Sequence, residues 1–185
     1  HLFEEYLAGR SSFEKLITDS RLEVIKNAHI DDGRYLPLSP MPKDITYGTT
    51  TYKKGAMVMH SLRGYLGDDL FRTAQQKVLE DYAYSNLTAN IYRDALSAAS
   101  GIDLTDFFNR WVFGIGFYDF VIQDFHALDF STNTHEITIK QKLLKSNGFL
   151  KDAPVSITFV DQDNKLISQR VLCTGEVTTI PLTLA

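Results

Sequence analysis

Apolar residues follow two different patterns along this chain, and the change falls near residue 114. Before that point, apolar side chains recur every three or four residues, which is the spacing of one face of an α-helix. After it, they alternate with polar side chains, as in a strand with one buried face. The sequence therefore predicts an α+β protein, in which an all-α bundle over residues 1–116 precedes an antiparallel β-sandwich over residues 117–185.

The helical part is predicted to contain a first apolar stripe, a long loop and four consecutive helices. The stripe begins at residues 2–7, and the loop covers residues 28–47, where three prolines and an Asp-Asp-Gly turn interrupt the pattern. A loop of this length is usually functional or disordered. The four helices lie between Tyr52 and Val112, with short loops between them. Their predicted caps and stops are Gly67, Asp68, Thr88, Gly101 and Asp103.

The sandwich is predicted from three alternating runs of apolar and polar residues. They cover residues 137–143, 155–159 and 180–184, and turn residues separate them. Several short strands at this spacing are typical of two antiparallel sheets packed face to face.

Composition excludes several classes of partner and site. The net charge is −4 and the pI is about 5.7, so the chain has no general electrostatic attraction for nucleic acid or an anionic membrane. The single cysteine, Cys173, excludes an internal disulfide and a cysteine-cluster metal site. No apolar run is long enough to cross a bilayer. The chain opens within an amphipathic helical pattern and without a methionine, and we expect it to be cut from a longer protein.

Residue chemistry alone does not complete an active site in this chain. No two of the five histidines are three or four residues apart, so a His-Glu-x-x-His zinc helix is absent. His60 is interpreted as a structural histidine, and Ser61 beside it points away from it on a helix. The chain also lacks the Gly-x-Ser-x-Gly elbow of serine hydrolases and the spacing of a phosphate-binding loop.

Three segments, in order and at matching spacing, carry a resemblance to a known family. Residues 47–56 read Tyr-Gly-Thr-Thr-Thr-Tyr-Lys-Lys-Gly-Ala, and residues 62–71 read Leu-Arg-Gly-Tyr-Leu-Gly-Asp-Asp-Leu-Phe. Residues 100–111 begin Ser-Gly-Ile-Asp-Leu and continue to Phe107, Phe108 and Trp111. Together they resemble the aminopeptidase N family of zinc metallopeptidases, in which a tyrosine followed one residue later by Lys-Gly opens a helix that faces the catalytic zinc.

This resemblance implies a fold, an activity and a cofactor. Residues 1–116 would be the C-terminal half of a thermolysin-like catalytic domain, followed by the sandwich. The parent protein would be a zinc-dependent aminopeptidase that removes N-terminal residues from peptides, with all its zinc ligands before His1. The zinc would belong to the intact parent, so no cofactor is expected in this chain. The chain alone would be inactive and would act together with the N-terminal remainder of the same polypeptide.

The resemblance assigns a catalytic role to Tyr52. Peptide hydrolysis passes through a tetrahedral intermediate with a negatively charged oxygen, and a positioned hydroxyl donor stabilises that charge. Tyr52 would be this donor, and Tyr47 would line the same substrate cleft. The competing interpretation is that Tyr52 packs at the start of a helix, as most of the nine tyrosines must be structural. Arg63 and the Lys53-Lys54 pair could bind a substrate carboxylate, but we interpret them as solvated helix charges.

The sequence departs from the family pattern at two places, and two other functions remain as alternatives. Lys53 stands where many members have an acidic residue, and Phe117-Tyr118 stands where a Gly-x-Pro ending is common. The parent could instead be a non-catalytic homologue whose domains serve as a protein-interaction or scaffold module. The sandwich could also be a module that binds a carbohydrate or a protein. An upstream zinc-binding helix would favour the enzyme.

Overall fold

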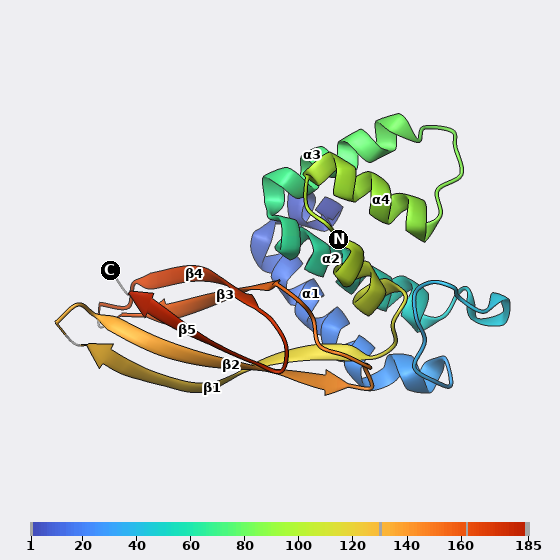
Figure 1. Ribbon diagram of the computed structural model, residues 1–185. Coiled ribbons are helices and arrows are strands. Elements are labelled where there is room, and N and C mark those ends of the chain that lie inside the picture. Colours follow the sequence, from blue (N-terminus) through green and yellow to red (C-terminus); the bar gives the residue numbers. More distant parts are fainter. Residues whose placement is uncertain (1, 130, 162, 184–185) are drawn as a thin grey trace. The chain divides into compact units, whose positions relative to one another are not determined.

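The computed structural model describes residues 2–129, 131–161 and 163–183, and Figure 1 shows its helices and strands. The chain divides into two compact units, His1–Phe117 and Tyr118–Ala185. Helices form the first unit and antiparallel strands dominate the second, so the predicted α+β class is confirmed.

The helical unit is built from five α-helices and three short helices of other types among the described residues. The α-helices are α1 (Leu2–Asp31), α2 (Gly55–Leu66), α3 (Asp68–Asp81), α4 (Ala89–Ser100) and α5 (Thr105–Phe107). The others are the 3₁₀ turn η1 (Lys43–Ile45) and the π-helical segments η2 (Thr50–Lys54) and η3 (Phe108–Val112). Helix α1 is interrupted at Gly9, whose φ of 83° lies outside the helical region and suits a residue without a Cβ.

One apolar core joins α2, α3, α4 and the α5–η3 segment. Its buried members recur at helical spacing, which is why the sequence pattern located these helices. They are Val58, Leu62, Leu66, Phe71, Ala74, Val78, Leu96, Leu104, Phe107 and Phe108. Leu62 is 1% exposed and Leu96 is fully buried, so substitutions there act directly on the core.

Helix caps were predicted with mixed success. The Thr88 hydroxyl accepts the N–H of Ile91 at the start of α4, and Gly101 ends that helix in the left-handed conformation, so both predictions are confirmed. The predicted cap at Asp68 is wrong. Gly67 precedes the helix instead, and the Asp68 carboxylate is held by the guanidinium of Arg63.

The bounds of the predicted loop and of the following helix also differ from the structure. Helix α1 continues to Asp31, so the loop starts later than residue 28, and η1 gives it one turn of helix. The helix expected from Tyr52 begins two residues earlier, at Thr50, and its first turn is π-helical. The spacing of apolar residues does not signal such a turn. A π-helical turn holds one residue more than an α-helical turn, and the same types of residue form both.

The second unit contains two antiparallel sheets. The first has the strand order β1-β2-β5 and the second pairs β3 with β4, as Figure 1 shows. The strands are β1 (Phe117–Asp129), β2 (Thr134–Leu144), β3 (Ala153–Val160), β4 (Leu166–Cys173) and β5 (Val177–Thr183). In register, Ile137 lies opposite Ile180 and Ile157 lies opposite Gln169.

Side chains from both sheets form one hydrophobic core in this unit. Its buried members are Ile137, Ile139, Ile157, Val171, Cys173 and Leu182. Gln141 is also buried, and its amide group donates to the Leu150 carbonyl and accepts the Leu150 N–H, each at 3.0 Å. Both hydrogen-bonding ends of this amide are therefore satisfied, which offsets the cost of burying it.

Candidate functional site

Tyr52 lies in the π-helical segment η2, at the start of the helical run that continues as α2. Its N–H donates to the Gly48 carbonyl at 3.3 Å, and its own carbonyl accepts the N–H of Gly55. The Gly55 N–H also reaches the Thr50 carbonyl, five residues back, which is the π-helical connection. The side chain is 58% exposed, so the phenol projects from the turn toward solvent.

Tyr47 lies beside Tyr52. The ring centroids are 6.4 Å apart and the ring planes are inclined by 28°. Tyr47 is 84% exposed, so the two phenols share an open face of the helical unit. The structure therefore brings together both tyrosines that the sequence analysis singled out, and the packing interpretation of Tyr52 does not fit its exposure.

The carboxylate of Asp32 holds the backbone just before Tyr52. Its Oδ1 accepts the Thr49 N–H at 3.0 Å and its Oδ2 accepts the Thr50 N–H at 2.6 Å. These N–H groups begin a helix and have no partner within it, so they need an outside acceptor. Asp31 adds a third contact, since its Oδ2 accepts the Thr49 hydroxyl at 2.9 Å. Asp32 is only 7% exposed.

Gly48 makes room for this carboxylate. A Cβ built on Gly48 would lie 2.2 Å from Asp32 Oδ1 and 2.8 Å from its Cγ, far inside any real contact distance. The same Cβ would lie 3.0 Å from Cγ2 of Ile45. A residue with a side chain would therefore push Asp32 away from the two N–H groups.

Lys54, two residues after Tyr52, is buried. Its side-chain amine donates to the Leu36 carbonyl at 3.1 Å and lies 5.4 Å from the centroid of the Phe117 ring. Lys54 is 3% exposed, and this burial lowers the pKa of its amine to about 8. No ion pair of Lys54 occurs in the part of the chain that the structure describes. The interpretation of Lys54 as a solvated charge is wrong.

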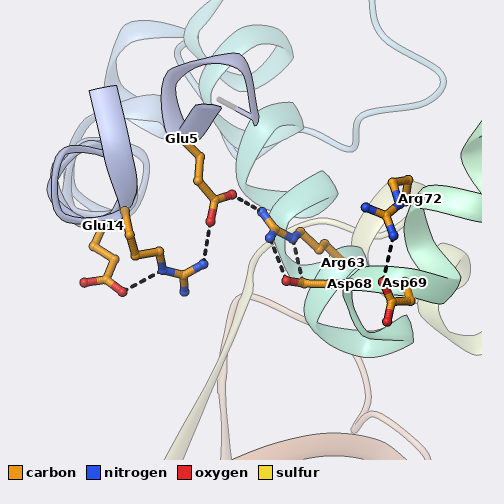
Figure 2. Close-up of polar contacts among 7 residues, drawn as sticks. Glu5, Glu14, Arg63, Asp68, Asp69 and Arg72 are labelled. Atoms are coloured by element: carbon orange, nitrogen blue, oxygen red, sulfur yellow. Dashed lines mark hydrogen bonds and ion pairs between the residues drawn. The ribbon is translucent and has the colours of Figure 1, made fainter. Parts of the chain in front are cut away.

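The neighbouring charged side chains form ion pairs within the helical unit. Lys53 pairs with Glu23 of α1 at 3.2 Å. Arg63, 13% exposed, is shared between Glu5 of α1 and Asp68 of α3, and Figure 2 shows these carboxylates converging on its guanidinium. The guanidinium lowers the pKa of both carboxyl groups through hydrogen bonds and charge. Arg63 is thus occupied by these two carboxylates rather than solvated.

His60 packs into the helical unit without a metal-binding partner among the described residues. Its ring meets the edge of Phe13 at a centroid distance of 5.6 Å. Burial is the main cause that lowers the pKa of its imidazole, and the charges of Arg63 and Arg10 add to it. A half-buried imidazole against an aromatic ring fits the structural role expected for it.

Residues 2–129, 131–161 and 163–183 contain no group of three or more His, Cys, Asp or Glu side chains arranged to hold a metal ion. The described side chains therefore do not fit a zinc ion. Over the same residues, no helix is both long and apolar enough to cross a membrane.

Sequence reasoning found Tyr52 and Tyr47 but missed Asp32 and Lys54. Adjacent carboxylates such as Asp31-Asp32 are common on solvated helix ends, and a lysine carries no sign of its burial. The one sequence signal was Gly48, a glycine outside any predicted turn, which marks a close backbone approach.

The residues just described all lie within the match to one protein family. The sequence model of the peptidase family M1 domain matches residues 14–111, which include both tyrosines, Asp32, Gly48 and Lys54. This chain belongs to peptidase family M1. The resemblance to the aminopeptidase N family is thereby confirmed at the level of the family.

Several curated proteins are similar in sequence to parts of this M1 chain. Probable aminopeptidase 2 of Sulfurisphaera tokodaii is 29% identical over 112 residues, covering 60% of this chain and 13% of the relative. Aminopeptidase N of Lactococcus lactis is 38% identical over 61 residues, covering 33% and 7%. Aminopeptidase N of Escherichia coli is 28% identical over 125 residues, covering 65% and 14%. The M1 chain thus spans between 7% and 14% of the length of these curated relatives.

A solved structure shares the fold. The aminopeptidase A of Legionella pneumophila, crystallised with aspartic acid, superposes with a TM-score of 0.69. The alignment covers 98% of the M1 chain and 20% of the Legionella chain, at 20% identity. At this identity the likeness supports the fold alone.

Proposed function

We propose that this chain is part of a zinc-dependent aminopeptidase that hydrolyses N-terminal residues from peptides, and that Tyr52 is its oxyanion-stabilising donor. The observation that carries the proposal is the exposed phenol of Tyr52 on a π-helical turn within the M1 match. π-Helical turns are rare and occur frequently at functional sites. The relatives that match this segment carry the name aminopeptidase.

Tyr52 suits the stabilisation of a developing oxyanion. The phenol is a neutral hydrogen-bond donor on a rigid ring, so it can meet a negative oxygen without bringing a charge of its own. A donor aimed at the position where charge develops lowers the barrier of the reaction more than it strengthens substrate binding. Tyr47, stacked against it, lines the same face and is proposed as a wall of the substrate cleft.

The zinc of the proposed enzyme would be held outside this chain. Enzymes of this family use zinc, and the described residues do not form a site for it. We therefore assign the metal ligands to another part of the same polypeptide, and we expect the 185-residue chain to be inactive alone.

The finer assignment of the fold is also proposed. Residues 1–116 would form the C-terminal half of a thermolysin-like catalytic domain, and residues 117–185 would form a β-sandwich. The shared core between the β1-β2-β5 sheet and the β3-β4 sheet supports the sandwich. The division into helical and strand units near residue 117 supports the boundary.

The test is Tyr52→Phe in the intact, zinc-containing protein. Loss of one oxyanion donor lowers kcat by roughly 10²–10³, and we expect a fall of that order with KM nearly unchanged on aminoacyl-p-nitroanilides. Tyr84→Phe is the matched control, because it removes the same hydroxyl from a fully exposed residue in the same unit. A near-normal kcat in Tyr52→Phe would remove Tyr52 from the reaction. An intact protein that neither binds zinc nor hydrolyses these substrates would instead favour a scaffold function.

A further inference from the structure

The Tyr52 phenol depends on the backbone of its own turn for its direction. Its side chain is 58% exposed, and its ring contact is with Tyr47, which is 84% exposed and is too weakly packed to hold the Tyr52 ring in one direction. The segment that sets the angle of the Cα–Cβ bond of Tyr52 is therefore the turn that begins with Thr49 and Thr50. Whatever fixes these two residues also aims the phenol.

That turn is fixed from a distant part of the sequence. The usual arrangement at the start of a helix is a side chain of the N-cap residue that accepts an N–H two or three residues later. Here the N-cap Thr49 makes no such bond, and its hydroxyl donates to Asp31 instead. The Asp32 carboxylate replaces the local cap, with one oxygen on the Thr49 N–H and the other on the Thr50 N–H.

A carboxylate is well matched to this position. Two adjacent N–H groups at the start of a helix carry partial positive charge, and they bind an ionised acceptor more strongly than a neutral one. Each oxygen of Asp32 takes one N–H, so the carboxylate fixes both the position and the rotation of the first turn. A single acceptor would fix only one point.

Two further features tie this clamp to Tyr52. Gly48 leaves space for the carboxylate, since a Cβ there would lie 2.2 Å from Asp32 Oδ1. The Gly48 carbonyl, in turn, accepts the N–H of Tyr52 at 3.3 Å. The residue that admits Asp32 is thus hydrogen-bonded directly to the residue whose side chain must be aimed.

We propose that Asp32 is a positioning residue for Tyr52, holding the π-helical turn so that the phenol points at the reacting group. The proposal rests on the proposed function of Tyr52. If Asp32 has this role, replacing one of its two acceptor oxygens should leave the Tyr52 phenol in place but pointing in the wrong direction. Misplacement of a catalytic group by about 1 Å can cost on the order of a hundredfold in rate.

The main experiment is a double-mutant cycle in the intact enzyme. Asp32→Asn keeps the shape of the side chain but replaces one acceptor oxygen and the charge, and we expect kcat to fall roughly ten- to a hundredfold with KM nearly unchanged. In a Tyr52→Phe background the same change should have little further effect, because the group that it positions is already gone. Asp19→Asn is the matched control, since it changes an exposed carboxylate on α1, the helix that ends immediately before Asp32.

The cycle separates the two proposals. A normal kcat in Tyr52→Phe overturns the proposed function. A large loss in Tyr52→Phe together with no loss in Asp32→Asn, or with an equal loss from Asp32→Asn in both backgrounds, overturns the positioning role alone. Gly48→Ala offers a second perturbation, because its methyl group pushes the same carboxylate from the other side, and it should reproduce the kcat loss.

Amide hydrogen exchange tests the clamp without any variant or activity. In the wild-type chain, the N–H groups of Thr49 and Thr50 should exchange slowly, because both donate to a buried carboxylate. Asp32→Asn should speed their exchange, and Asp19→Asn should not. Unprotected Thr49 and Thr50 in the wild type would overturn the proposal even if every variant failed to fold.

Discussion

Lys54 makes the stability of the helical unit depend on pH in an unusual direction. Burial lowers the pKa of its amine from the ordinary 10.5 to about 8, so between these pH values the unfolded state binds more protons than the folded state. The free energy of unfolding must then rise as pH rises through this window. Below pH 8 the folded state bears the full cost of a buried ammonium.

The magnitude follows from the same two values. One pKa unit is worth about 1.4 kcal/mol, so the difference between 10.5 and about 8 corresponds to roughly 3 kcal/mol. The Phe117 ring, 5.4 Å from the amine, attracts the charged form by about 0.5–2 kcal/mol and reduces this cost. We expect wild-type stability to gain about 1–3 kcal/mol between pH 7 and pH 10.5 from Lys54.

Lys54→Met tests this expectation, because methionine fills similar space and does not titrate. The variant loses the hydrogen bond to the Leu36 carbonyl, so its absolute stability mixes a gain with a loss. The pH dependence of its stability is free of this ambiguity. In Lys54→Met, the rise of about 1–3 kcal/mol in the free energy of unfolding should disappear. Lys53→Met is the matched control, because it makes the same replacement at the half-exposed lysine next in the chain.

The assay is urea unfolding of the chain at several pH values between 7 and 10.5. Trp111 is the single tryptophan and lies in the helical unit, so its fluorescence follows that unit alone. Linear extrapolation gives the free energy of unfolding at each pH. If the curves of Lys54→Met and wild type run parallel across the window, burial of the Lys54 amine does not penalise its charged form.

Two other perturbations test the core and the ion-pair network. Leu62→Ala should lower the free energy of unfolding by about 2–5 kcal/mol, whereas Leu79→Ala, 70% exposed, should change it by less than about 1 kcal/mol, as urea titrations can measure. Arg63 holds the pKa values of Glu5 and Asp68 below their ordinary range, so the stabilisation is present above about pH 4 and is lost as pH falls. The Tm gap between wild type and Arg63→Met should therefore narrow from pH 6 to pH 3, and a constant gap would contradict the ion-pair role.

The helices and strands could be predicted because they follow repeating patterns. The spacing of buried residues located the core helices, and Thr88 and Gly101 bounded α4 through local chemistry. Asp68 was wrong as a cap because its carboxylate had a stronger partner, the guanidinium of Arg63, which a local rule does not include. Local signals therefore predicted the elements, and contacts across the chain decided their ends.

The site was predictable only in part for the same reason. Tyr52 and Tyr47 came from the resemblance to a family, and the structure places them side by side. Asp32 lies 18 residues from Thr50 in sequence, so no local pattern could connect the two. The burial of Lys54 depends on the Leu36 carbonyl and on Phe117, both far from it along the chain.

The π-helical turn that carries Tyr52 links the direction of a side chain to the length of the chain. Each residue of an α-helix advances about 100° around the axis, so one residue added or removed between Tyr52 and Gly55 would turn Tyr52 by about that angle relative to α2. The buried face of α2, which begins at Val58, would keep its own register. Length variation between Tyr52 and α2 thus offers evolution, or a protein engineer, a way to re-aim this side chain while the buried face of α2 keeps its register.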